Sequence, residues 1–326
     1  MAAGGGTRAI VAAMLANAGI AIAKFIAFLV TGSAAMLAES IHSTADTSNQ
    51  GLLLLGGNRA RRIADDEHQF GYGRERYFWA FVVALVLFTL GGAYSIYEGI
   101  QKIRDPHELE SIGWAIGVLL LGIVLEGFSF RTAIIEAQKV KGDQTWWQYI
   151  RNSRSPEIPV VLLEDAGAQI GLILALIGVG MYAITGNEVW DAVGTLSIGI
   201  LLCIIAIVLT IEMQSLLIGE AASDDHLRAI NAAVRRTSSV IRIIDLRTQH
   251  IGPDEILVAG KVEFDHSLTN PQTADAINEC EAEIREVVPI ARRIYIEPDL
   301  YEKAHPDAAE SSAGEEHAAG REGDSH

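Results

Sequence analysis

The chain has 326 residues, of which 50% are hydrophobic and 20% charged, and its mean hydropathy is +0.26. Several apolar stretches near 20 residues long could each cross a bilayer as a helix. This composition excludes a soluble enzyme and predicts a polytopic helical membrane protein with no enzymatic activity. The net charge of −16 argues against nucleic acid as a partner.

Six apolar runs predict six transmembrane helices, which would place both chain ends on one side of the membrane. The runs cover about 9–31, 34–56, 78–100, 112–135, 158–183 and 190–217. The loops after the second and fourth runs are rich in Arg and Lys, whereas the opposite loops carry only Lys102 and Arg104. Because positive loops stay inside, we expect both termini in the cytoplasm.

The second run contains a polar stripe in which His42 and Asp46 are four residues apart. On a helix this spacing puts both side chains on one face, one turn apart. An Asp at the centre of a membrane helix costs about 2.5–3.5 kcal/mol on insertion scales, so such residues are rare without a function. The stripe continues with Asn49 and Gln50.

One helix cannot complete a metal site, and the fifth run offers the matching set, Glu164, Asp165 and Gln169. Three ligands from His42, Asp46 and Asp165, with a fourth, would suit a tetrahedral divalent ion such as Zn²⁺. The alternative is a buried polar network or a proton pathway that holds no metal.

After residue 217 the sequence changes to that of a soluble protein. Helical periodicity over 224–237 and 273–287, with strand patterns over 241–249, 256–264 and 291–296, gives the order αββαβ. We therefore predict a transmembrane domain over 1–217 and, over 218–302, an α+β domain with an antiparallel sheet on one side and two helices on the other. The acidic remainder, 303–326, has no apolar period and is predicted to be disordered.

These motifs resemble the cation diffusion facilitator family over roughly residues 8–300. The resemblance rests on His42-x-x-x-Asp46, on the loop from Ala64 to Glu75, on the Asp165 region and on the segment Asp245 to Thr248. It implies a six-span, proton-coupled exporter of zinc or a similar ion, with a cytoplasmic ferredoxin-like domain that supports a homodimer.

The resemblance also implies a transport site made from a His/Asp-x-x-x-Asp pair in each of the second and fifth spans. The second span matches, but Val161 stands where the fifth span would supply a ligand four residues before Asp165. Glu164, about 100° round the helix from Asp165, is the candidate replacement, and a water molecule is the alternative.

Two further metal sites implied by the family are altered here. Asp65 and His68 match an interfacial zinc site, but Tyr72 replaces its second His and is a poor ligand at neutral pH because its phenol pKa is about 10. We predict a weak second site or a loop held by salt bridges of Asp66, His68 and Arg74.

In the soluble domain the implied ligand positions hold Ile244, Lys261, Glu297 and Asp299. Lys261 would repel a cation, so we expect this domain to serve dimerisation more than metal storage. His250 and His266 fall outside the pattern and are predicted to lie on the surface.

The function predicted from these observations is proton-coupled export of a divalent cation from the cytoplasm. The imidazole favours Zn²⁺, while the carboxylates also admit Mn²⁺, Fe²⁺, Co²⁺ or Cd²⁺. Alternatives are a dimeric membrane scaffold or metal-responsive regulator with a degenerate site, and a proton-coupled transporter of an organic cation.

Overall fold

The computed structural model describes residues 34–105 and 112–301, together with helical positions 11, 14–15, 17–23, 25–26 and 29. Within α2 (Ala34–Arg59), side chains are described from Ser43 onward, apart from that of Ala45. The predicted first span is therefore described only in part, and the predicted tail lies outside the described residues. The chain forms two compact units, one ending at Ile218 and the other beginning at Gly219.

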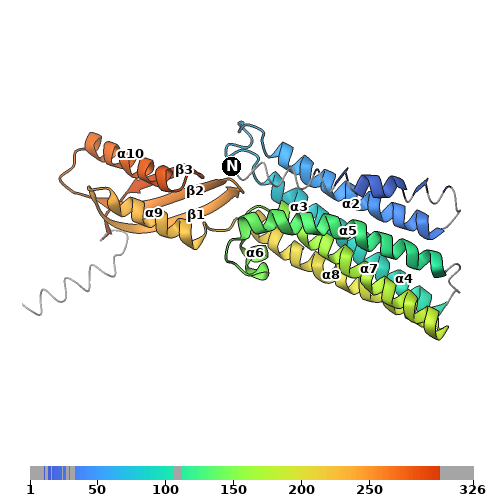
Figure 1. The fold of residues 1–326 in the computed structure, drawn as a ribbon. Coiled ribbons are helices and arrows are strands. Elements are labelled where there is room, and N and C mark those ends of the chain that lie inside the picture. The colour runs from blue at the N-terminus through green and yellow to red at the C-terminus, as the bar shows by residue number, and fades with distance from the viewer. Residues whose placement is uncertain are drawn as a thin grey trace, which may run out of the picture. The chain divides into compact units, whose positions relative to one another are not determined.

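The first unit consists of long helices (Figure 1). Within the described residues four helices are long and apolar enough to cross a membrane, and α2 is not among them because it carries the polar stripe. The predicted total of six spans thus stays a prediction. The elements are α2 (Ala34–Arg59), α3 (Glu75–Val86), η1 (Leu87–Ala93), α4 (Tyr94–Arg104), α5 (Ile112–Lys141), α6 (Trp146–Asn152), α7 (Glu157–Thr185) and α8 (Val189–Ile218).

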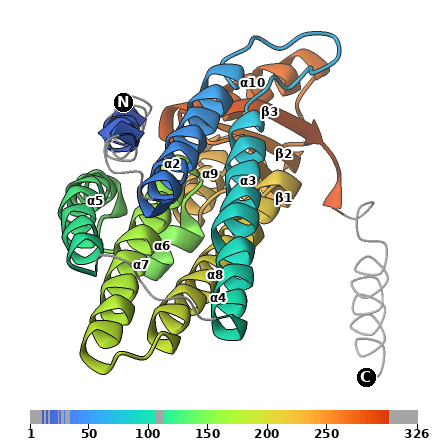
Figure 2. The same cartoon turned by 90° about the vertical axis from the view of Figure 1, so that its right-hand side faces the viewer.

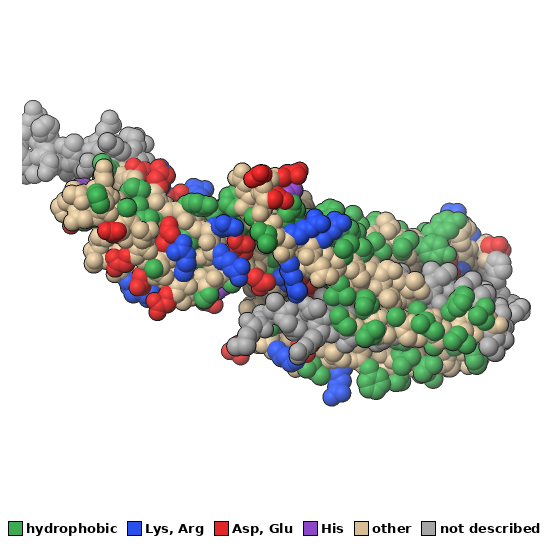
Figure 3. All heavy atoms as spheres, turned by 90° about the horizontal axis from the view of Figure 1, so that it is seen from above, with side chains coloured by type: hydrophobic (Ala, Val, Ile, Leu, Met, Phe, Trp, Pro, Cys, Tyr) green, Lys and Arg blue, Asp and Glu red, His purple; other side chains and the backbone are tan. Residues whose placement is uncertain are grey.

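The surface of these helices suits a lipid environment. Figure 3 shows hydrophobic side chains spread over the first unit, whereas acidic and basic side chains gather on the second. Leu90, Ile184 and Ile204 are among the large apolar side chains that are more than half exposed. A soluble protein rarely exposes apolar patches of this extent, so the first unit is built to lie in a membrane.

Helix α8 packs at backbone distance against the long helix formed by α3, η1 and α4. A Cβ atom at Gly92 would lie 2.5 Å from Cys203 Sγ, and one at Gly199 would lie 2.7 Å from the Ile96 backbone nitrogen. Small residues let membrane helices approach in this way. The π-helical turn η1 contains Gly92, so the irregular segment coincides with the closest contact.

The second unit has the predicted αββαβ order, with both helices packed against the sheet core (Figure 2). The prediction of an antiparallel sheet is wrong in one respect: β1 and β2 pair antiparallel, but β2 and β3 pair parallel. The reason is that α10 carries the chain back across the sheet before β3 begins, as in a βαβ unit. The elements are α9 (Asp224–Arg236), β1 (Val240–Gly252), β2 (Glu255–Phe264), α10 (Asn270–Val287) and β3 (Ala291–Pro298).

Candidate metal centre

Three helices bring four carboxylates together inside the first unit. Asp46 comes from α2, Glu126 from α5, and Glu164 and Asp165 from α7. All four are buried, and Coulombic repulsion from Asp46 and Glu126 reaches both acids of α7. A concentration of negative charge inside a membrane domain is costly unless a cation or protons compensate it.

Neutral hydrogen-bond donors hold the two acids of α7. Asn49 Nδ2 on α2 donates to Glu164 Oε1 at 2.7 Å, and Ser129 Oγ on α5 donates to Asp165 Oδ2 at 2.8 Å. Each acid therefore has one oxygen bonded to a different neighbouring helix. Because neither donor carries a charge, the negative charge of both acids remains available to a cation.

The bond from Asn49 fixes the direction in which the Glu164 side chain points. Its bond to Asn49 shows that this side chain points toward α2, although it neighbours Asp165 around α7. Glu164 is 4% exposed, and its Oε2 has no hydrogen-bond partner among the described residues. Val161 is buried in the hydrophobic core and offers no ligand atom. The role of Glu164 as the ligand that Val161 does not supply stays a prediction.

Other buried polar atoms belong to residues that follow Asp46 and Asp165 closely in the sequence. Within the part of the chain that the structure describes, buried amide atoms of Asn49, Gln50 and Gln169 also have no hydrogen-bond partner. These residues follow Asp46 or Asp165 by three or four positions on α2 and α7. A buried polar group without a partner costs free energy, which is the pattern expected around a site that holds water or an ion.

The structure leaves His42 as a prediction. Its backbone lies in α2 one turn before Asp46, but its side chain is outside the described part. Among the described side chains, no group of three His, Cys, Asp or Glu residues has a spacing that could hold a metal ion. The acids are therefore close to one another without meeting at one point, and the predicted ligand set is not tested by this arrangement.

Sequence reasoning missed Glu126 and Ser129. Glu126 is the single acidic residue in the apolar run 112–135, and that isolation inside a membrane span was the available signal. No spacing rule connects it with Asp46 or Asp165, because the connection is made only by the packing of α5 against α7.

The family model for the cation efflux transmembrane domain matches residues 10–218. The chain belongs to this family. These are the cation diffusion facilitators whose motifs it resembles.

Named relatives agree with this assignment. The chain is 34% identical over 245 residues to the proton-coupled zinc antiporter SLC30A9, mitochondrial, of Mus musculus, covering 74% of this chain and 43% of the relative. It is 30% identical to metal tolerance protein C4 of Arabidopsis thaliana, covering 79% and 57%. For the cation-efflux pump FieF of Klebsiella pneumoniae the identity is 26%, with 77% and 79% covered.

The chain spans less than half the length of the mouse relative. Among solved structures, a MamM-CTD variant covers 24% of this chain and 96% of its own at 18% identity, with a TM-score of 0.23. A score this low carries no argument about the sheet domain.

The loop that resembles the family's interfacial zinc site is organised around Asp65. Tyr72 Oη donates to Asp65 Oδ2 at 2.6 Å, and the His68 amide donates to Asp65 Oδ1 at 2.7 Å. The tyrosine bond is the main reason that the pKa of Asp65 is lowered, and it raises the pKa of Tyr72. Both carboxylate oxygens are engaged, so a metal at Asp65 and His68 would have to displace Tyr72.

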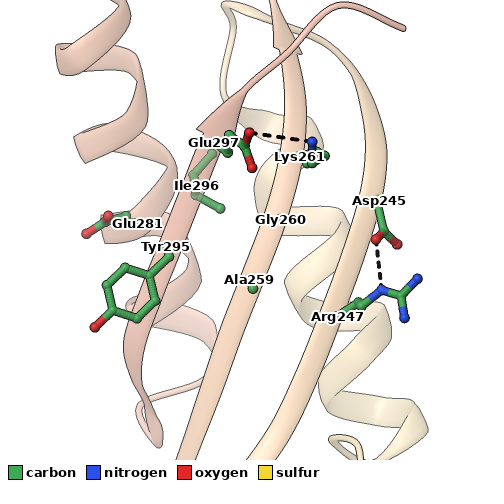
Figure 4. A pocket seen from close by; sticks show the side chains of 9 residues that line it. All are labelled: Asp245, Arg247, Ala259, Gly260, Lys261, Glu281, Tyr295, Ile296 and Glu297. Carbon is green, nitrogen blue, oxygen red and sulfur yellow. Dashed lines mark hydrogen bonds and ion pairs between the residues drawn. The ribbon is translucent and has the colours of Figure 1, made fainter. Parts of the chain in front are cut away.

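In the sheet domain a lysine lies between the acids at the positions where the family holds metal. Lys261 Nζ is 3.0 Å from Asp299 Oδ2 and 3.4 Å from Glu297 Oε1. Figure 4 shows the pair with Glu297. The bond to Asp299, followed by the charge of Glu297, raises the pKa of Lys261, which stays protonated at neutral pH. A second ion pair, Asp245 with Arg247, lines the same pocket of about 390 Å³.

The prediction for one sheet-domain histidine is wrong. His250 is 2% exposed, with Nδ1 3.2 Å from the Gly252 carbonyl oxygen, whereas His266 is exposed as predicted and lies 3.1 Å from Glu263. The His250 amide donates to the Glu220 carbonyl oxygen at 2.7 Å. The segment before α9 thus pairs with the end of β1, a contact that local sequence does not reveal.

Proposed function

We propose that this member of the family is a proton-coupled antiporter that exports a divalent cation, first of all Zn²⁺, from the cytoplasm. The ligands are Asp46, Glu164 and Asp165, with His42 from the same face of α2. The observation that carries the proposal is the burial of Glu164 and Asp165 beside α2 with their negative charge uncancelled. The name of the mouse relative, a proton-coupled zinc antiporter, supports zinc and protons as substrates.

Antiport follows from competition between protons and metal for the same atoms. Metal binding requires ionised carboxylates and a neutral imidazole, so the ion displaces protons on one side and protons displace it on the other. Four neighbouring carboxylates exceed the charge of one divalent ion, so protons must neutralise the cluster when the ion leaves. Alternating exposure of the site would come from rocking of the helices.

Orientation and assembly belong to the same proposal. The arginine- and lysine-rich loops after α2 and α5 support a cytoplasmic location for both termini. The sheet domain, in which Lys261 pairs with Glu297 and Asp299, serves contact between two copies of the chain and not metal storage.

The test is zinc flux in proteoliposomes with an imposed pH gradient. Wild type should carry zinc against the proton flow, and Asp46→Asn and Asp165→Asn should abolish it. Asp191→Asn is the matched control, because Asp191 is a helix acid that pairs with Lys102 at 3.0 Å. Absence of flux, with zinc binding that depends on Asp165, would favour the metal-responsive regulator. Absence of both would contradict the proposal.

A further inference from the structure

One oxygen of each acid of α7 accepts a hydrogen bond from another helix. Asn49 donates to Glu164 Oε1 and Ser129 donates to Asp165 Oδ2, so the oxygens not bonded to these donors are Glu164 Oε2 and Asp165 Oδ1. Glu164 Oε2 is buried and has no partner within the described residues. The two donors come from α2 and α5, so the orientation of each carboxylate is fixed by a helix other than its own.

We propose that Asn49 and Ser129 are positioning residues that set ion specificity by limiting Glu164 and Asp165 to one ligand oxygen each. The proposal rests on the proposed function, because it concerns the same site. Neither residue needs to touch the ion. Each acts through the carboxylate to which it donates a hydrogen bond.

Coordination chemistry connects this geometry with specificity. Four single ligand atoms from Asp46, Glu164, Asp165 and His42 make a four-coordinate site, the number that Zn²⁺ adopts with N and O ligands. Mn²⁺ prefers six oxygen ligands in an octahedral arrangement. A carboxylate released from its donor can turn and offer both oxygens, which raises the ligand count and removes the disadvantage of Mn²⁺.

The neutrality of both donors fits this role better than a purely structural one. A Lys or Arg would hold the carboxylate more firmly but would cancel the charge that attracts the ion. Interhelical hydrogen bonds in membranes contribute little to stability on average, so neither bond is needed for the stability of the bundle. Partners that orient ligands typically change metal affinity by about 10–100-fold when they are removed.

The experiment measures Zn²⁺ and Mn²⁺ dissociation constants of the purified full chain by equilibrium titration. Ser129→Ala removes one donor, and Asn49→Leu removes the other while keeping the branched shape and the number of heavy atoms of the side chain. Each should lower the preference for Zn²⁺ over Mn²⁺ by about tenfold. Ser129→Thr keeps the hydroxyl and should keep the wild-type preference.

Matched controls come from hydroxyls on the same helices that bond only to their own backbone. Thr132 Oγ1 donates to the Phe128 carbonyl oxygen on α5, and Ser48 Oγ donates to that of Thr44 on α2. Thr132→Ala and Ser48→Ala should leave the preference unchanged. An equal shift in these controls would overturn the proposal.

The remaining outcomes separate this inference from the proposed function. Unchanged preference in Ser129→Ala overturns the positioning role even if Asn49→Leu does not fold. If Ser129→Ala keeps the preference but Asp165→Asn loses metal binding, the proposed metal site stands and only the positioning role is overturned. Wild type that binds neither ion through Asp165 overturns both.

Discussion

The two units of this chain treat clustered carboxylates in opposite ways. In the helical unit, Glu164 and Asp165 are buried and receive hydrogen bonds from the neutral side chains of Asn49 and Ser129. In the sheet domain, Glu297 and Asp299 are paired with the ammonium group of Lys261. The first arrangement orients negative charge, and the second offsets part of it with an internal cation.

The contrast shows two ways to stabilise neighbouring carboxylates: one leaves room for a bound cation, and the other puts a lysine side chain in its place. A site that loads and releases an ion must keep charge uncompensated at some stage, and buried carboxylates with neutral donors do so at the expense of stability. The ammonium group of Lys261 is a permanent positive charge. It offsets one of the two negative charges of Glu297 and Asp299 without a bound ion.

Glu164→Gln should have the largest effect on zinc binding, because it removes a buried negative charge from the helical unit. The substitution keeps the shape of the side chain but removes the charge that Asn49 leaves available, so the zinc dissociation constant should rise by about 100-fold, or about 3 kcal/mol. Titration of the full chain with Zn²⁺ measures this, with Asp191→Asn as the control. Unchanged affinity would mean that water, and not Glu164, fills the fourth position.

Glu126→Gln should have the next largest effect. Glu126 adds negative charge near both α7 acids, so its neutralisation should weaken zinc binding by about tenfold while the Zn²⁺ over Mn²⁺ preference stays as in wild type. Glu136→Gln, on the same helix beside Lys139, is the control. A change of preference instead of affinity would assign Glu126 a direct role as a ligand.

Lys261→His should remove the internal cation from the sheet domain and make its carboxylates available to a metal ion. An imidazole beside Glu297 and Asp299 supplies three candidate zinc ligands in place of an internal cation. In an Asp165→Asn background, calorimetry should detect one new zinc site with a dissociation constant on the order of micromolar. Lys261→Met removes the cation without adding a ligand and should bind more weakly. Equal binding by both variants would show that the imidazole contributes nothing.

Tyr72→Phe should give the smallest effect, and it depends on pH. The hydrogen bond from Tyr72 holds the pKa of Asp65 below its usual value, so its stabilisation is present above pH about 4 and is lost as pH falls through the lowered pKa. The variant should melt slightly below wild type at pH 7, and the difference should shrink in acid. Tyr97→Phe, with an exposed side chain on α4, is the control. A difference that does not change with pH would contradict the assignment.

The helices and strands were readable from the sequence where a single periodicity dominated. Runs of apolar residues predicted α5, α7 and α8, and the αββαβ order followed from alternation between helical and strand patterns. The parallel pairing of β3 was not readable, because alternation specifies which face is buried and not the direction of the neighbouring strand. The burial of His250 depends on the Glu220 segment, which lies 30 residues earlier in the chain.

Some residues of the candidate site could also be predicted from the sequence, and others could not. The four-residue spacing in α2 and the acids of α7 could be found because each lies on one helix. Glu126 and Ser129 could not, because only the packing of α5 on α7 connects them with those acids. The family resemblance raised the question of Glu164, and its bond to Asn49 supplied an orientation that no spacing rule could give.

The close packing of α8 against the long helix of α3, η1 and α4 has a mechanical consequence. Where backbones approach so closely that a methyl group at Gly92 or Gly199 would collide, the two helices cannot slide past each other without separating. We therefore expect them to move as one lever. The relative displacement that would expose the proposed site to either side would then fall on the other contacts, those made by α2, α5 and α7.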